Sequence, residues 1–189
     1  MSIFDAIESG DAARAAGLVA GDPIRAVARN EQGVSPLMLA RYHSQTEIVA
    51  TLLDAAPELD VFEAAALGVV ERLEQLVDED PGKARARSAD DTTALHFAAF
   101  FNQPECVRIL LEHGADVHGV SPTFGNVTPL HSGAAADSLE IVRQLVEHGA
   151  DVNARQNGGF TALDAAVENG NDELRRYLEE RGAERGVIR

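Results

Sequence analysis

The sequence has one cysteine, no tryptophan and few aromatic residues of any kind. The single cysteine, Cys106, cannot form a disulfide within the chain, so no disulfide framework holds the fold together. Phenylalanine and tyrosine together supply only 5% of the 189 residues, so a place where they gather is informative. No apolar stretch approaches the ~18 residues that a membrane-spanning helix needs, and we therefore expect no membrane segment.

Positive charge is also scarce. Lysine and arginine number 16 against 31 aspartates and glutamates, which gives a formal net charge of −15. Such a field repels phosphate backbones and anionic lipid, so neither nucleic acid nor a membrane is an expected partner. A basic protein surface stays open as a partner, and solubility alone also explains the acidity. Residues 1–21 lack the basic and apolar regions of a signal peptide, which favours a cytoplasmic location.

The second half of the chain repeats a short pattern. Residues 93–96 read T-A-L-H, residues 128–131 read T-P-L-H 35 positions later, and residues 161–164 read T-A-L-D another 33 positions on. The letters E-H-G-A-D-V at 112–117 return at 147–152, again 35 positions later, followed by Asn153. Recurrence at this distance indicates a stacked array in which each small repeat contacts its neighbours.

The first half contains the same organisation in a less regular form. Residues 3–53 align with residues 61–111 when the sequence is shifted by 58 positions, which superposes Gly10 on Gly68 and Pro23 on Pro81. Together the two patterns predict six repeats, at about 1–32, 33–59, 60–90, 91–125, 126–158 and 159–189.

Each repeat carries two short helical patterns. The first helix is rich in alanine, and the second has apolar pairs one turn apart, as in Ile141-Val142 and Leu145-Val146. Gly114, Gly149 and Gly182 follow second helices, where a left-handed residue is favoured. Asp137, three residues before Glu140, predicts a capping box for the second helix of repeat five.

The T-P-L-H and G-A-D-V-N words at this spacing resemble the ankyrin repeat, most strongly in repeats four to six. The resemblance implies an all-α solenoid of about six helix–turn–helix repeats with short β-hairpin fingers, forming a single domain over residues 1–189. The connection at residues 54–60 is too short for a finger between repeats two and three. Ankyrin arrays usually bind another protein through their concave face, so the resemblance implies the same role here.

In the ankyrin family, two positions at the end of each first helix, together with positions in the fingers, face the concave groove. This correspondence implies that partner-binding residues are Tyr42, His43, Leu67, Phe100, Phe101, Phe124, Phe160, Glu168 and Asn169. Aromatic residues gather at these positions, and aromatic anchors dominate binding energies at interfaces. We therefore expect a hydrophobic docking patch centred on Phe100 and Phe101 and flanked by Tyr42 and Phe124. The alternatives are that one of the central rings packs near repeat three, or that both are structural.

Residues suited to chemistry recur with the array instead of forming one unique cluster. His96 and His131 could form a metal pair, but the favoured interpretation is that each ring hydrogen-bonds at the start of its helix. Cys106 occupies the position of Ile48 and Ile141 in sister repeats, so we expect it to be buried and inert. Lys83, Arg85 and Arg87 alternate, which predicts an extended segment with one basic face that pairs with nearby acids.

Another pair of histidines, His113 and His148, ends the second helices of its repeats, where a cation favours the helix dipole. The sequence shows no glycine-rich phosphate loop, zinc-ligand spacing or catalytic-triad spacing. We therefore expect a monomeric, non-catalytic protein-binding module without cofactor or metal. The alternative is an enzyme, or a binder of a small ligand or ion, whose site the sequence does not reveal.

Overall fold

The computed structural model describes residues 2–55 and 58–186, and their regular structure is helical. The twelve α-helices of these residues are α1 Ile3–Glu8, α2 Ala12–Gly21, α3 Pro36–Tyr42, α4 Thr46–Asp54, α5 Val61–Leu67, α6 Val70–Glu79, α7 Ala94–Phe100, α8 Pro104–Glu112, α9 Pro129–Ala135, α10 Leu139–Glu147, α11 Ala162–Glu168 and α12 Asp172–Glu179. Three short 3₁₀ helices are η1 Pro23–Val27, η2 Pro81–Arg85 and η3 Asn157–Gly159. The predicted all-α repeat fold is confirmed.

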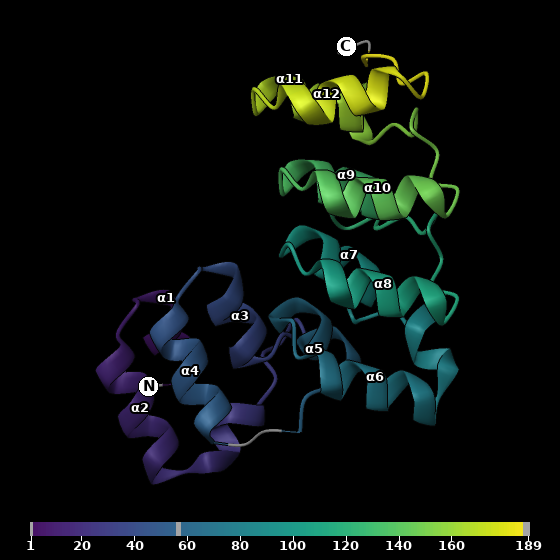
Figure 1. The fold of residues 1–189 in the computed structure, drawn as a ribbon. Coiled ribbons are helices and arrows are strands. Elements are labelled where there is room, and N and C mark those ends of the chain that lie inside the picture. Colours follow the sequence, from purple (N-terminus) through teal and green to yellow (C-terminus); the bar gives the residue numbers. More distant parts are fainter. Residues whose placement is uncertain (1, 56–57, 187–189) are drawn as a thin grey trace. The chain divides into compact units, whose positions relative to one another are not determined.

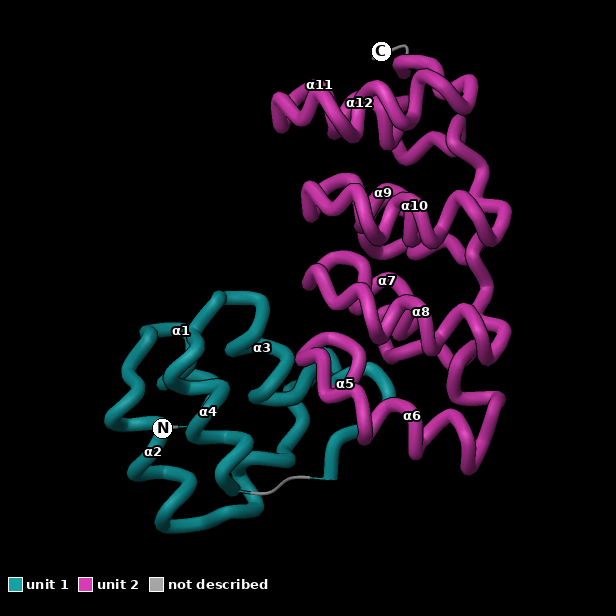
Figure 2. Tube along the Cα trace, in the orientation of Figure 1, with its two compact units in different colours: residues 1–63 teal, residues 64–189 magenta. Residues whose placement is uncertain are grey.

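The chain divides into two compact units, residues 1–63 and residues 64–189 (Figure 2). In the N-terminal unit, α1 packs on α2 and α3, and α4 packs on α2 and α3. In the C-terminal unit the helices form two layers, because α7, α9 and α11 pack in series and α6, α8 and α10 pack in a second series (Figure 1). That a single domain spans all six predicted repeats stays a prediction.

Close packing between the two layers depends on small side chains in the first helices. Ala94, Ala98 and Ala99 of α7 are fully buried. At Gly133 of α9, an added Cβ would lie 2.8 Å from Cγ2 of Ile141 in α10, so glycine permits the contact. The second helices supply large core side chains, such as Ile141 and Leu145, which explains their apolar stripes, and the first helices add Leu95 and Leu130.

The turn between the paired helices has a left-handed residue in every pair. These residues are Gly10 (φ 68°), Ser44 (55°), Gly68 (72°), Asn102 (56°), Asp137 (57°) and Gly170 (69°). The predicted capping box at Asp137 is therefore wrong: the N-cap of α10 is Ser138, and its side chain makes no capping hydrogen bond. Asp137 takes the place that glycine occupies in other repeats, and its Oδ1 accepts a hydrogen bond of 2.8 Å from Asn171 Nδ2.

The connections between repeats contain the predicted fingers in a minimal form. Gly114, Gly149 and Gly182 have φ of 76°, 92° and 78°, which confirms the predicted left-handed helix ends. The hairpins consist of tight turns, and in the described part of the chain two of them close with an isolated antiparallel bridge, Arg87 to Thr93 and Ser121 to Val127.

Two further expectations concern the connections. Lys83 and Arg85 lie in η2, so the predicted extended segment is wrong, because Pro81 starts a 3₁₀ turn there. The connection expected to lack a finger, residues 54–60, includes residues 56–57, which lie outside the described residues.

The backbone at Gly149 offers a direct test of these helix ends. Replacing Gly149 by alanine should lower the free energy of unfolding by about 1 kcal/mol, because the φ of 92° disfavours any Cβ although no atom lies within 4 Å of the position. The matched control is Gly17→Ala inside α2, where space is also open and alanine should instead stabilise by up to about 1 kcal/mol. Urea unfolding measures both; the same sign for the two variants would contradict the assignment.

Candidate partner-binding surface

The end of α7 exposes a pair of aromatic rings. Phe100 is the last residue of the helix, and Phe101 is its C-cap, with its amide donating to the Phe97 carbonyl at 2.9 Å. The ring centroids lie 5.1 Å apart at an interplanar angle of 80°, an edge-to-face pair. Phe100 is 49% exposed and Phe101 is half-buried. Of the two central rings, Phe100 is therefore the more exposed.

The other predicted helix-end residues also lie at or beside the ends of first helices. Tyr42 is 36% exposed at the end of α3 and His43 beside it is exposed, whereas Leu67 at the end of α5 is half-buried. Glu168 and Asn169 are exposed, but Asn169 Nδ2 donates to the Ala134 carbonyl at 3.2 Å, so its amide links two neighbouring repeats. Tyr42 and His43 belong to the N-terminal unit, and the predicted flanking of the phenylalanine pair by Tyr42 stays a prediction.

The finger residues occupy the opposite end of the first helices. His96 in the first turn of α7 contacts the carbonyl of Val127, just before α9, so the starts of α7 and α9 lie side by side. Phe124, 48% exposed, precedes α9, and the half-buried Phe160 precedes α11. A seven-residue helix is about 10 Å long, so Phe124 and the ring of Phe100 mark two ends of the surface and not one cluster.

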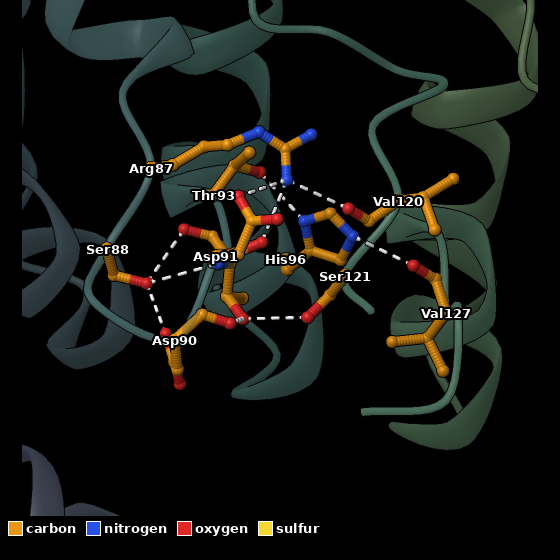
Figure 3. A network of polar contacts seen from close by, with 10 residues as sticks. Arg87, Ser88, Asp90, Asp91, Thr93, His96, Val120, Ser121 and Val127 are labelled. Carbon is orange, nitrogen blue, oxygen red and sulfur yellow. Dashed lines mark hydrogen bonds and ion pairs between the residues drawn. The ribbon is translucent and has the colours of Figure 1, made fainter. Parts of the chain in front are cut away.

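A buried hydrogen-bond network lies beneath this surface (Figure 3). Nδ1 of His96 lies 2.8 Å from Thr93 Oγ1, and its Nε2 lies 3.2 Å from the Val127 carbonyl. Because a carbonyl only accepts, Nε2 carries the proton, and Nδ1 accepts from the threonine hydroxyl. The neutral ring thus satisfies both contacts, and burial lowers the pKa of His96 to about 4.

The same arrangement recurs one repeat later and then changes. His131 contacts Thr128 Oγ1 at 2.9 Å and the Phe160 carbonyl at 3.2 Å, and burial lowers its pKa. At the corresponding place in α11 stands Asp164, which is fully buried. Its carboxylate accepts from Arg185 Nε at 2.9 Å and from the Gly186 amide at 2.7 Å.

The hydrogen-bond partners of Asp164 explain its ionisation. Burial acts to raise the pKa of this carboxyl, but the hydrogen bonds from Arg185, Gly186 and Thr161 outweigh burial and hold the pKa below its usual value. The carboxylate therefore stays charged in the fold. In α7, α9 and α11 the third helical residue therefore matches the group that the following segment presents, a carbonyl oxygen for histidine and N–H groups for aspartate.

The comparison with known families agrees with this geometry. The family model described as ankyrin repeats (3 copies) matches residues 61–121 and 118–187, which is more than half of the chain. The chain belongs to the ankyrin repeat family. Ankyrin repeats are generally protein–protein interaction modules and are typically non-catalytic. Both matches lie within predicted repeats three to six.

A recurring arginine in the ankyrin fingers has a structural role that the sequence analysis did not predict. In three turns its guanidinium donates to the carbonyl four residues later: Arg29 to Gly33 at 3.5 Å, Arg87 to Asp91 at 2.8 Å and Arg155 to Gly159 at 3.3 Å. Arg87 also pairs with the Asp91 carboxylate at 3.0 Å and reaches the Val120 carbonyl of the next finger at 2.9 Å (Figure 3). The sequence does contain a signal for this role, because Arg29 and Arg87 coincide when the sequence is shifted by 58 positions.

The side chains that could bind a metal or act in catalysis have structural roles in this ankyrin array. Both nitrogens of His96 and of His131 are engaged, which leaves neither ring free for a metal. Among the described residues, no group of three or more histidine, cysteine, aspartate or glutamate side chains is placed to hold a metal ion. Cys106 is fully buried as expected, and burial raises the pKa of its thiol to about 11, so little thiolate forms near neutral pH.

Over the described ranges, every helix is too short or too polar to cross a bilayer.

The buried neutral ring of His96 predicts a loss of stability in acid. The folded-state pKa of about 4 lies below the value of 6.5 for a free ring, so the unfolded chain binds the proton more tightly. The neutral His96 ring therefore contributes up to about 3 kcal/mol to the free energy of unfolding. This contribution is complete above pH 6.5 and is lost as the pH falls toward 4. Urea unfolding between pH 7 and pH 4.5 should show a weaker pH dependence in His96→Gln than in the wild type.

The control for this measurement is His118→Gln, because His118 is exposed in a finger. Its pH dependence should match that of the wild type. The His96 variant should also be less stable at pH 7 with unchanged metal content, since the ring serves the helix start. Loss of a stoichiometric metal ion in that variant would overturn the structural role.

Proposed function

We propose that this ankyrin array binds a partner protein through the concave face formed by its first helices and fingers, with Phe100 and Phe101 as the main contact. The observation that carries the proposal is the 49% exposure of Phe100 in a chain with only 5% aromatic residues. Helix propensity gives no reason for two adjacent phenylalanines at the end of an alanine-rich helix. Exposed apolar side chains of this size often mark interfaces.

The neighbouring surface favours an apolar segment of the partner. Helices α7 and α9 contain no aspartate, glutamate, lysine or arginine. At the positions of α9 that correspond to the phenylalanine pair, Ala135 and Ala136 have small side chains. A leucine or aromatic side chain of the partner would bury Phe100 there without removing any charge from water.

The remaining residues form the margin of the proposed surface. In the C-terminal unit these are Leu67, Glu168 and Asn169 at the helix-end side and Phe124 and Phe160 at the finger side, and Tyr42 and His43 offer a helix end of the N-terminal unit by itself. The margin is mixed in polarity, as the rim of an interface commonly is. We expect most of the binding energy at the two central rings and a smaller share from the margin.

We further propose a cytoplasmic monomer that does not bind nucleic acid. The net charge of −15 and the single buried thiol support this assignment. Light scattering after size exclusion tests the monomer. A thermal-shift screen of metabolites and ions tests the alternative of a small-ligand binder, since a ligand of the folded state raises the melting temperature.

The proposed contact predicts a specific loss of binding. Phe101→Ala and Phe100→Ala should each weaken partner binding by about 2 kcal/mol or more if the pair is a hot spot. The partner is first identified by pull-down from the source cell with mass spectrometry, and its affinity for each variant is then measured by calorimetry. The control is Ile24→Ala, because Ile24 is 71% exposed but belongs to η1 and not to the end of a first helix.

A thermal melt of each variant shows that it remains folded. Equal affinity for the wild type and both phenylalanine variants would remove this pair from the interface. An equal loss in Ile24→Ala would show that the effect is not specific to the pair.

A further inference from the structure

A histidine at the end of α8 links two consecutive repeats. His113 is the C-cap of α8, and its Nδ1 lies 2.8 Å from the carbonyl of Ile109, one turn earlier. Its Nε2 lies 3.0 Å from Oδ1 of Asp78, which belongs to α6 in the preceding repeat. Helices α6 and α8 pack against each other, so this contact closes one end of their interface.

The two partners of His113 require a charged ring. The Ile109 carbonyl and the Asp78 carboxylate both accept hydrogen bonds, and neither donates. A neutral imidazole carries one N–H group, so it satisfies one partner and turns a lone pair toward the other. Only the imidazolium donates to both. His96 differs, because its two partners are one donor and one acceptor, which the neutral ring satisfies.

We propose that His113 and Asp78 form a pH-sensitive clamp that joins the second helices of repeats three and four while His113 is protonated and opens when it loses the proton. The clamp lies on the second-helix layer and does not depend on where a partner binds.

The charged groups around His113 favour the protonated ring. Asp78 faces it from α6, and Glu112 adjoins it on α8. The nearby positive charge is Arg85 of η2, whose Nε donates to the carbonyl of Gly114, the residue after His113, at 2.7 Å. The bond to the Ile109 carbonyl and then the bond to Asp78 raise the pKa of His113 above 6.5. The clamp is therefore complete below pH 6.5 and weakens as the pH rises through the folded-state pKa.

The next repeat supplies a natural comparison. His148 ends α10 in the same way, with Nδ1 2.7 Å from the Gln144 carbonyl. The residue 35 positions before His113 is Asp78, whereas the residue 35 positions before His148 is His113 itself. The position that holds an acid in repeat three thus holds a base in repeat four. His148 shares the helix-end bond but not this acidic partner.

The test is a pH titration of the histidine rings by NMR in the full chain. Wild-type His113 should titrate above about 6.5, the value of a free ring. Asp78→Asn should lower its midpoint, since the amide removes the negative charge while keeping the shape. The control His148→Gln should leave the midpoint of His113 unchanged. The same midpoint for His113 in the wild type and Asp78→Asn would overturn the clamp.

Hydrogen exchange tests whether the charge holds the helices together. After correction for the intrinsic pH dependence of exchange, peptides from α6 and α8 should be better protected at pH 6 than at pH 8.5 in the wild type. Asp78→Asn and His113→Gln should each remove this difference, and His148→Gln should retain it. A difference that persists in Asp78→Asn would show that the pair does not couple the repeats.

Discussion

The first helices α5, α7, α9 and α11 begin at buried positions, and their unpaired N–H groups must be satisfied there without water. The third helical residue contributes to the helix start in these repeats and also contacts a neighbouring segment. Asp164 accepts hydrogen bonds from the chain that follows it, and His96 donates a hydrogen bond from Nε2 to a carbonyl of the next finger. Glu63 accepts from the Asp60 amide at 3.1 Å and lies 3.5 Å from Arg29 of an earlier finger. In these four repeats one side chain therefore serves the helix start and joins it to an adjoining segment, and the residue type suits the group that it contacts.

Two of the histidines respond to pH in opposite directions. His96, in the first-helix layer, faces one donor and one acceptor, and burial lowers its pKa to about 4. His113, in the second-helix layer, faces two acceptors, and its hydrogen bonds to Ile109 and Asp78 raise its pKa. The two responses fall in different pH ranges: the His96 contribution is lost as the pH falls below 6.5, and the His113 contribution is lost as the pH rises above it. Their sum is therefore greatest near pH 6.5, and single variants are needed to assign each side of the profile.

The sequence predicted those features that depend on local chemistry. Gly149 recurs after a second helix because a left-handed residue strongly favours glycine, and the structure confirms it. Asp137 occupies an equally left-handed turn, but aspartate also begins helices, so its local sequence predicted a cap. The pairing of Asp78 with His113 and the reach of Arg87 to Val120 join residues 33 to 35 positions apart. Such contacts depend on the stacking of repeats, which spacing alone places only approximately.

Small side chains in the first helices accompany both the close packing of the array and the exposure of Phe100. At Gly133 of α9, even a Cβ would meet Ile141 at 2.8 Å. Large buried side chains, such as Leu95 and Leu130, lie at other positions of these helices. The positions of α9 that correspond to the phenylalanine pair hold only alanine, and Phe100 is 49% exposed. The array thus leaves Phe100 at its surface, where an apolar side chain of another protein would complete the packing that α9 does not supply.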